Sequence, residues 1–386
     1  MTRTEKLVYD LCNLTFLSLW SFANPLGKKD KELCDVLVIC EPDIIIFSVK
    51  DIQIKDSGNL EVDFNRWIER AIKSSAKQIY GAERFLESST QVKLNDGKTI
   101  IDIPKNNNTR IHRVAVAFGR GDRFPLQYGD FGNGFVHVLD ERAVEIVLKE
   151  LDTITDFVNY LDSKEKFIRE GKFPFTYSEE DMLAYFISNN FSFPEEADVV
   201  IFESDLYEGL SNDSKYQEIL ARLSISYVWD NLIEKLVDDF KNGLLINDVT
   251  RNELELTIRQ MAREDRNKRK FLSEKFLEFV GYFEEPKAVS RLIKSNDDLI
   301  YVFLLGDFNE RERRMRELQL RCFVARSKFN CTKIIGLATE KYSKDGYSMD
   351  FSYSHYPYFD DESIQKAKEL SEELNYFNNP RISGFK

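Results

Sequence analysis

The first part of the chain alternates between helical and extended hydrophobic patterns. From about residue 4 to residue 21, Leu7, Leu11 and Leu14 recur at helical spacing. The next two apolar runs, CDVLVIC and IIIFSVKDIQI, are short and rich in Val and Ile, and the EPD between them is typical of a turn. This pattern predicts a helix followed by a hairpin of two largely buried strands.

The alternation continues in a βαβ-like manner to about residue 170. Between residues 65 and 87, Trp67, Ala71, Gln78 and Ala82 fall along one helical stripe. Two further segments, IHRVAVAF and GFVHVLD, predict strands, and the Gly-rich GRGDRFPLQYGDFGNG between them predicts a loop. A long helical pattern from ERAVEIVLKEL to KEKFI would then close an N-terminal domain.

The remaining sequence divides into two regions that differ in their hydrophobic patterns. Residues from about 178 to 280 are mostly amphipathic helix, whereas the last hundred residues mix helical segments with the strand-like LIYVFLLGD and TKIIGLATE. At about 150 residues per domain, a chain of 386 residues suggests two or three domains. We therefore expect an α/β protein with an N-terminal core (1–170), a mostly helical middle region (171–290) and a small α/β C-terminal region (291–386).

Composition narrows the classes of function. The net charge of -12 gives no support to broad, charge-driven nucleic-acid binding, although it is compatible with a local site. The five cysteines form no CxxC pair and the three histidines lie far apart, which argues against a disulfide framework and a structural zinc site. No window approaches the roughly 18 apolar residues of a membrane span, and no cleavage site follows the early apolar segment. We expect a cytoplasmic protein with no membrane partner.

Charged residues stand at the ends of the two predicted hairpin strands. Side chains alternate along a strand, so Asp35 shares a face with Leu37, and Ser48 shares a face with Lys50. The turn between the strands would bring Asp35 and Lys50 together at the end of the sheet. A carboxylate there could hold a divalent metal, and an ammonium beside it could orient or deprotonate a water for attack on a phosphodiester.

With these residues, the N-terminal 170 residues resemble the PD-(D/E)xK, or restriction-endonuclease-like, nuclease superfamily. The core of that superfamily is a helix, a strand hairpin carrying Asp and then (Asp/Glu)-x-Lys, and a following helix. The resemblance implies that Asp35 binds Mg²⁺ or Mn²⁺ and that Lys50 is the catalytic lysine. It further implies that Glu5, in the first helix, and the main-chain carbonyl of Val49 add to the metal shell. Ser48 stands where the family has Asp or Glu, and a neutral hydroxyl is a weaker metal ligand.

Gln78 is a further point of likeness. It resembles the glutamine in the post-core helix of the recombination-type exonuclease branch, although Tyr80 does not match that branch's spacing of glutamine to tyrosine. The segments FLSLWSFANP, KELCDVLV and IIIFSVKD are also similar to uncharacterised bacterial proteins of the superfamily. These likenesses support the fold and identify no substrate.

Each candidate residue also has a purely structural interpretation. Asp35 and Lys50 would form an ordinary salt bridge, because a short D…SxK pattern arises often by chance. Glu5 would be a helix cap, since an acid in the first turn is favoured by the helix dipole whatever the function. Gln78 would be a helix-face hydrogen-bonding residue.

Other segments offer weaker candidates for contact with nucleic acid. Arg120 and Arg123 in the Gly-rich loop could meet phosphates, and the loop lacks the spacing of a phosphate-binding loop. Tyr128 and Phe131 could stack on bases. Two basic segments, RNELELTIRQMAREDRNKRKF and NERERRMRELQLRCFVARS, contain interspersed acids, which favours a self-paired, solvated helix surface.

The leading hypothesis from the sequence is a metal-dependent nuclease that hydrolyses phosphodiester bonds of DNA, in a setting such as bacterial defence against phage or mobile DNA. The alternative is a catalytically weakened nuclease fold, marked by Ser48, that binds nucleic acid or a partner protein. A third hypothesis is a scaffold that assembles with other subunits or with copies of itself. The sequence does not decide whether the substrate is DNA or RNA, or whether cleavage is internal or terminal. A small phosphoester also remains a possible substrate.

Overall fold

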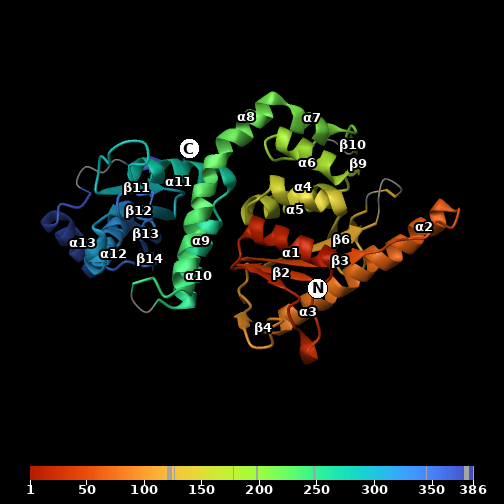
Figure 1. Ribbon diagram of the computed structural model, residues 1–386, viewed down its shortest axis with the longest axis horizontal. Coiled ribbons are helices and arrows are strands. Elements are labelled where there is room, and N and C mark those ends of the chain that lie inside the picture. The colour runs from red at the N-terminus through yellow and green to blue at the C-terminus, as the bar shows by residue number, and fades with distance from the viewer. Residues whose placement is uncertain are drawn as a thin grey trace. The chain divides into compact units, whose positions relative to one another are not determined.

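The computed structural model describes residues 1–119, 124–125, 127–176, 178–196, 199–246, 249–344, 346–377 and 382–385. It is a mixed α/β protein whose contacts group the chain into two units, Met1–Leu220 and Ala221–Lys386 (Figure 1). Residues 171–220 therefore lie in the first unit, and residues 221–290 lie in the second. This grouping does not test whether the three regions expected from the sequence fold as separate domains, and that stays a prediction.

The first unit is built around a mixed sheet of six strands in the order β1-β2-β3-β6-β8-β7. The strands are β1 (Ser21–Ala23), β2 (Val36–Cys40), β3 (Asp43–Asp51), β6 (Arg110–Phe118), β7 (Gly129–Asp130) and β8 (Phe135–Leu139). β2 and β3 form the expected antiparallel hairpin, and β3, β6 and β8 run parallel to one another. β3 keeps an unbroken register with β6 along its whole length, so Lys50 and Asp51 lie on opposite faces of the sheet.

Helices cover both faces of this sheet (Figure 1). One face packs against α1 (Arg3–Phe16), α4 (Glu141–Glu150) and α5 (Ile154–Arg169). There Phe47 of β3 contacts Phe16 and Phe157. The other face packs against one long helix made of α2 (Leu60–Trp67), a π-helical turn (Ile68–Lys73) and α3 (Ser74–Ser88). Small buried residues on this helix, such as Ala76 and Ala82, let it lie close to the strands.

Shorter elements complete the first unit. They are the strand pairs β4 (Gln91–Lys93) with β5 (Ile100–Asp102) and β9 (Phe173–Phe175) with β10 (Val199–Ile201), and the helices α6 (Glu179–Ser188) and α7 (Leu206–Asn212). The helix α8 (Ser214–Leu223) begins in the first unit and ends in the second. The long helical pattern that begins at Glu141 forms two helices, α4 and α5, instead of one. The break has a local cause, because Thr153 is an N-cap whose side chain accepts a hydrogen bond from the Asp156 N–H.

The second unit contains a five-stranded mixed sheet in the order β14-β13-β12-β11-β15. The strands are β11 (Ser290–Lys294), β12 (Leu299–Leu305), β13 (Lys333–Thr339), β14 (Met349–His355) and β15 (Ile382–Gly384). The parallel strands β12 and β13 are joined by α12 (Arg311–Phe329). α12 lies so close to β13 that a side chain at Gly336 would meet Cys322 and Leu318.

The opposite face of this second sheet packs against helices from the middle of the chain. These are α9 (Tyr227–Lys241), α10 (Arg251–Ala262) and α11 (Arg266–Phe279), whereas α13 (Asp361–Glu373) packs on α12. Phe303 of β12 contacts Trp229 of α9 and Phe276 of α11. The basic segment that begins at residue 251 is again two helices, because Asp265 caps the start of α11.

The five cysteines are buried free thiols. Among the described residues, none of the helices combines the length and the apolar character needed to cross a bilayer.

Candidate active site at the end of the hairpin

The backbone of the β2–β3 hairpin places the candidate residues on one face of the sheet. Leu37 pairs with Ile46 across the hairpin, and the Asp35 N–H donates to the carbonyl of Phe47 at 3.2 Å. Continuing this register sets Asp35 opposite Ser48, on the face that Leu37 and Ile46 share. That face is covered by α3. The register therefore adds that Asp35 lies on the same face as Ser48 and Lys50, which the alternation within each strand did not determine.

Asp35 is a buried carboxylate held by the neighbouring strand. Its Oδ2 accepts a hydrogen bond from the main-chain N–H of Val49 at 2.6 Å, and the Lys50 Nζ lies 3.6 Å from the same oxygen. Only 2% of the Asp35 side chain is exposed, against 26% of the Lys50 side chain. The carboxylate is therefore shielded from solvent, whereas the ammonium is partly exposed.

Gln78 reaches this pair from α3. Its Oε1 accepts hydrogen bonds from the Ser48 Oγ at 2.7 Å and from the Lys50 Nζ at 2.8 Å. Ser48 is fully buried, so its hydroxyl needs such a partner. Asp35, Ser48, Lys50 and Gln78 thus form one connected group, here called the hairpin cluster. In this arrangement Gln78 restrains the lysine and does not merely hydrogen-bond along its own helix.

A second carboxylate, which the sequence analysis did not single out, belongs to this site. Glu32 shares a side-chain hydrogen bond with Asp35 and accepts another from Asn24 Nδ2 at 2.9 Å. Desolvation of its carboxyl, followed by the charge and the hydrogen bond of Asp35, raises the pKa of Glu32 above its usual value. Glu32 lies three residues before Asp35 in KELCD, outside the two predicted strands. No side-chain period applies to such a segment, so the sequence does not indicate which way the Glu32 side chain points.

Glu5 and Val49 occupy structural roles. Glu5 is the third residue of α1 and forms a capping box with Thr2, whose N–H donates to the Glu5 Oε2 at 2.7 Å. Its negative charge also acts on Glu32, which places Glu5 at the margin of the site. Val49 contributes its N–H to Asp35. Metal ligation by Glu5 or by the Val49 carbonyl stays a prediction.

The oxygen groups of the site suit a hard divalent cation that is bound jointly by protein, water and substrate. Asp35 and Glu32 bring two carboxyl groups within hydrogen-bonding distance, and the repulsion that raises the pKa of Glu32 is the kind that a divalent cation relieves. Mg²⁺ is commonly held by one or two carboxylates together with waters and substrate phosphates. Within the described ranges, no group of three or more His, Cys, Asp and Glu side chains is arranged to enclose a metal ion. The residues therefore fit a partly hydrated ion and do not build a cage.

The weaker candidates from the sequence are mostly engaged elsewhere. Arg120 and Arg123 lie outside the described residues. The ring of Tyr128 stacks on that of Phe135, with 6.5 Å between their centres, and the half-buried Phe131 packs against the hydrophobic core. In the two basic segments, ion pairs to nearby acids hold Arg259, Arg266, Lys268, Arg269, Lys270, Arg311, Arg313, Arg314 and Arg321. Five of these pairs join residues three or four apart, as a self-paired helix surface requires. The interpretation is wrong for the other four. Arg266 and Arg269 pair with Asp230 of α9, and Arg311 and Arg314 pair with Asp350 of β14. Arg269 and Arg314 are buried, so these side chains join packed elements instead of facing solvent.

The chain matches no protein-family model, and neither a curated protein nor a solved structure is significantly similar to it.

Proposed function

We propose that this protein is a metal-dependent nuclease that hydrolyses phosphodiester bonds of DNA at the hairpin cluster. The observation that carries the proposal is the connection of Asp35, Ser48, Lys50 and Gln78, which come from β2, β3 and α3. The order of helix α1, hairpin β2–β3, helix α3 and parallel strand β6 also agrees with the plan of a restriction-endonuclease-like core. Such a core places its acid and its lysine at the end of the hairpin, as here.

The metal in this proposal is Mg²⁺ or Mn²⁺, held by Asp35 with Glu32. When bound, the ion neutralises charge on the scissile phosphate. The two carboxyl groups provide hard oxygen ligands and leave coordination positions for water and for the substrate. Ser48 adds at most a neutral oxygen, so we expect a weak metal site that is filled at millimolar Mg²⁺.

Lys50 is the proposed catalytic residue and Gln78 its positioning residue. An ammonium has three N–H donors, and Gln78 accepts one of them at 2.8 Å. The others can hold the attacking water or a phosphate oxygen on the solvent-exposed side of the pair. Hydrolysis adds the water oxygen to phosphorus and releases one of the two esterified oxygens as an alcohol. A role in defence against phage or mobile DNA is part of this proposal.

The test is incubation of the purified chain with supercoiled plasmid, linear duplex and single strands in Mg²⁺ and in Mn²⁺. We expect cleavage by the wild type and a loss of at least about 100-fold in Asp35→Asn and Lys50→Ala. The matched controls are Asp51→Asn and Lys55→Ala, which alter exposed residues near the same strand end and should cleave like the wild type. Equal cleavage by all five proteins would refute the assignment of the hairpin cluster, and a gel of RNA substrates run in parallel decides between DNA and RNA.

Ser48 favours a second candidate function, a nuclease fold that binds nucleic acid or a partner protein without cutting. Its hydroxyl donates to Gln78 at a position where the related nucleases have an acid. Ser48→Asp separates the two functions, because a third carboxylate should tighten metal binding and raise cleavage of a merely weak site. If the wild type and Ser48→Asp are both inactive but retard DNA in a gel-shift assay, the binding function replaces the catalytic one.

A further inference from the structure

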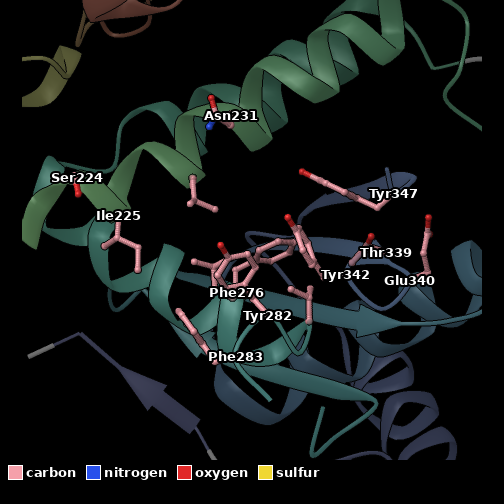
Figure 2. Close-up of a pocket in the computed structure, with 13 residues that line it drawn as sticks. Ser224, Ile225, Asn231, Phe276, Tyr282, Phe283, Thr339, Glu340, Tyr342 and Tyr347 are labelled. Carbon is pink, nitrogen blue, oxygen red and sulfur yellow. The ribbon is translucent and has the colours of Figure 1, made fainter. Parts of the chain in front are cut away.

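The second unit contains a cavity of about 580 Å³ that the hairpin cluster does not use. This volume lies within the range of about 300–1,000 Å³ that is usual for small-molecule sites. Its wall is rich in aromatic rings, from Phe276, Tyr282, Phe283, Tyr342 and Tyr347. Figure 2 shows Tyr282 and Tyr342 in the middle of this wall, with Glu340 at one end and Ser224 at the other. We call this space the aromatic cavity.

Backbone geometry holds the aromatic wall in place. α11 is followed by a left-handed Gly281, with a φ of 76°, and the Tyr282 N–H donates back to the carbonyl of Leu277 at 3.0 Å. A side chain at Gly281 would come within 2.7 Å of the Glu284 carbonyl oxygen, so the turn requires glycine. The Tyr342 N–H donates to the Val280 carbonyl at 3.1 Å, which ties the loop after β13 to the end of α11.

The polar end of the cavity lies where β13 ends. Thr339 is the last residue of that strand and Glu340 follows it, which is where ligands usually bind in sheets with parallel strands. Glu340 accepts hydrogen bonds from the Ser348 N–H at 2.5 Å, the Ser348 hydroxyl at 2.6 Å and the Arg314 Nη1 at 2.7 Å. Burial alone would raise the pKa of Glu340, but these bonds lower it, so the carboxyl remains an acceptor. Oε2 accepts two of these bonds and Oε1 only one, so the capacity that remains for a ligand is at Oε1.

The chemistry of the cavity restricts the class of ligand. Aromatic faces favour a planar ring, on which they stack. A carboxylate at one end favours a ligand edge that presents adjacent N–H donors. Among the described residues that line the cavity none is Lys or Arg, so a phosphate would have no cation to pair with inside it.

We propose that the aromatic cavity binds a guanine base, stacked on its tyrosines with its N1–H and N2–H edge facing Glu340, whose Oε1 accepts a bond from this edge. Guanine is the common base whose Watson–Crick edge carries two adjacent N–H donors. Adenine and cytosine place an acceptor beside their amino group, and uracil sets its single N–H between two carbonyls, so each would turn a lone pair toward the carboxylate. Sugar and phosphate would remain outside the cavity. The base belongs either to a free nucleotide or to a nucleic-acid strand.

The test is isothermal titration of the full chain with guanosine, adenosine, cytidine and uridine. We expect guanosine to bind at least about 10-fold more tightly than the other three. Tyr342→Ala should weaken guanosine binding by about 10-fold or more, because a stacking face is lost. Glu340→Gln should abolish the preference for guanosine. Tyr358→Ala and Glu362→Gln, in exposed residues of the same unit, are the matched controls and should bind like the wild type.

Two further ligands distinguish the source of the base. GTP that binds like guanosine supports a free nucleotide, whereas a short single strand with one guanine that binds more tightly than guanosine supports a nucleic-acid ligand. Equal affinity for the four nucleosides, or no binding of guanosine at millimolar concentration, overturns the proposal. The comparison of the four nucleosides uses the wild-type chain alone, so it tests the proposal even if a variant fails to fold. Circular dichroism checks the folding of each variant.

Discussion

Two lysine–carboxylate pairs of the first unit, Lys164–Glu179 and Lys50–Asp35, differ in how far they are shielded from solvent. Lys164 of α5 contacts both carboxylate oxygens of Glu179, at 2.6 and 2.5 Å, and both side chains are 0% exposed. The Tyr160 hydroxyl donates to the same carboxylate at 2.7 Å, and the ammonium lies 4.8 Å from the ring centre of Tyr128. In the hairpin cluster, by contrast, Lys50 is 3.6 Å from Asp35 and remains partly exposed.

The difference separates a structural pair from one that can take part in chemistry. Burial lowers the pKa of Lys164, and contact with Glu179 opposes that shift. In the Lys164–Glu179 pair, each charge is therefore balanced by the other. Lys50 instead divides its donors between a glutamine, a distant carboxylate and solvent. A charged pair in a predicted hairpin is therefore informative about function only when its geometry leaves donors and acceptors for a ligand.

The largest effect that the comparison predicts is on Lys164. Lys164→Met should lower the free energy of unfolding by about 3–5 kcal/mol, because it leaves the buried charge of Glu179 without a cation to pair with. Urea denaturation measures this. The double variant Lys164→Met/Glu179→Leu should recover much of the loss, since both charges are gone. Lys166→Met, at an exposed position on the same helix, is the control and should change stability by less than about 0.5 kcal/mol. A similar loss in the two single variants would break the comparison.

Asp35 should show an intermediate effect. Asp35→Ala removes the acceptor of the Val49 N–H from a buried position, and we expect a loss of about 1–3 kcal/mol in the free energy of unfolding. Asp35→Asn keeps an oxygen acceptor, so it should lose less than Asp35→Ala. The same denaturation series tests this order. If Asp35→Asn were the more damaging variant, the hydrogen bond to the Val49 N–H would not be the main contribution of Asp35 to stability.

Lys50 should matter least for stability. Lys50→Met should change the free energy of unfolding by less than about 1 kcal/mol, because the ammonium is partly solvated and Asp35 keeps its bond to Val49. The same substitution should still abolish cleavage in the plasmid assay. A loss of stability as large as that of Lys164→Met would contradict the distinction between an open and a closed pair.

The smallest effect concerns the protonation of Glu32. Because its pKa is raised in the folded protein, folding favours its protonated form, and its contribution to stability is lost as the pH rises through the folded pKa. Asp35→Asn should lower the pKa of Glu32, since it removes the neighbouring charge. Carboxyl ¹³C NMR titration in metal-free buffer measures the shift, with Asp51→Asn as the control. An unchanged pKa in Asp35→Asn would show that Asp35 does not act on Glu32.

Local pattern determined the hairpin, its turn and the shared face of its polar residues. A strand has a side-chain period of two, so the spacing of Ser48 and Lys50 was enough to set them on one face, and the pairing register of the hairpin then placed Asp35 on that face too. The structural alternative for Glu5 was also readable, because a capping box depends only on residues three apart. Thr153 and Asp265, which divide the long helical patterns, act through equally local bonds.

Only the tertiary structure decided which distant side chains complete these sites. Gln78 lies 30 residues from Ser48 in the chain, and its contact depends on how closely α3 packs on β3. The direction of Glu32, the closing of Lys164 on Glu179 and the meeting of Tyr282 with Tyr342 likewise arise where separate elements come together. Periodicity indicates which face of an element is buried, but not which residue of another element it will meet. That choice belongs to the packing of helices against sheets, where the contacts are made between parts of the chain that are far apart in sequence.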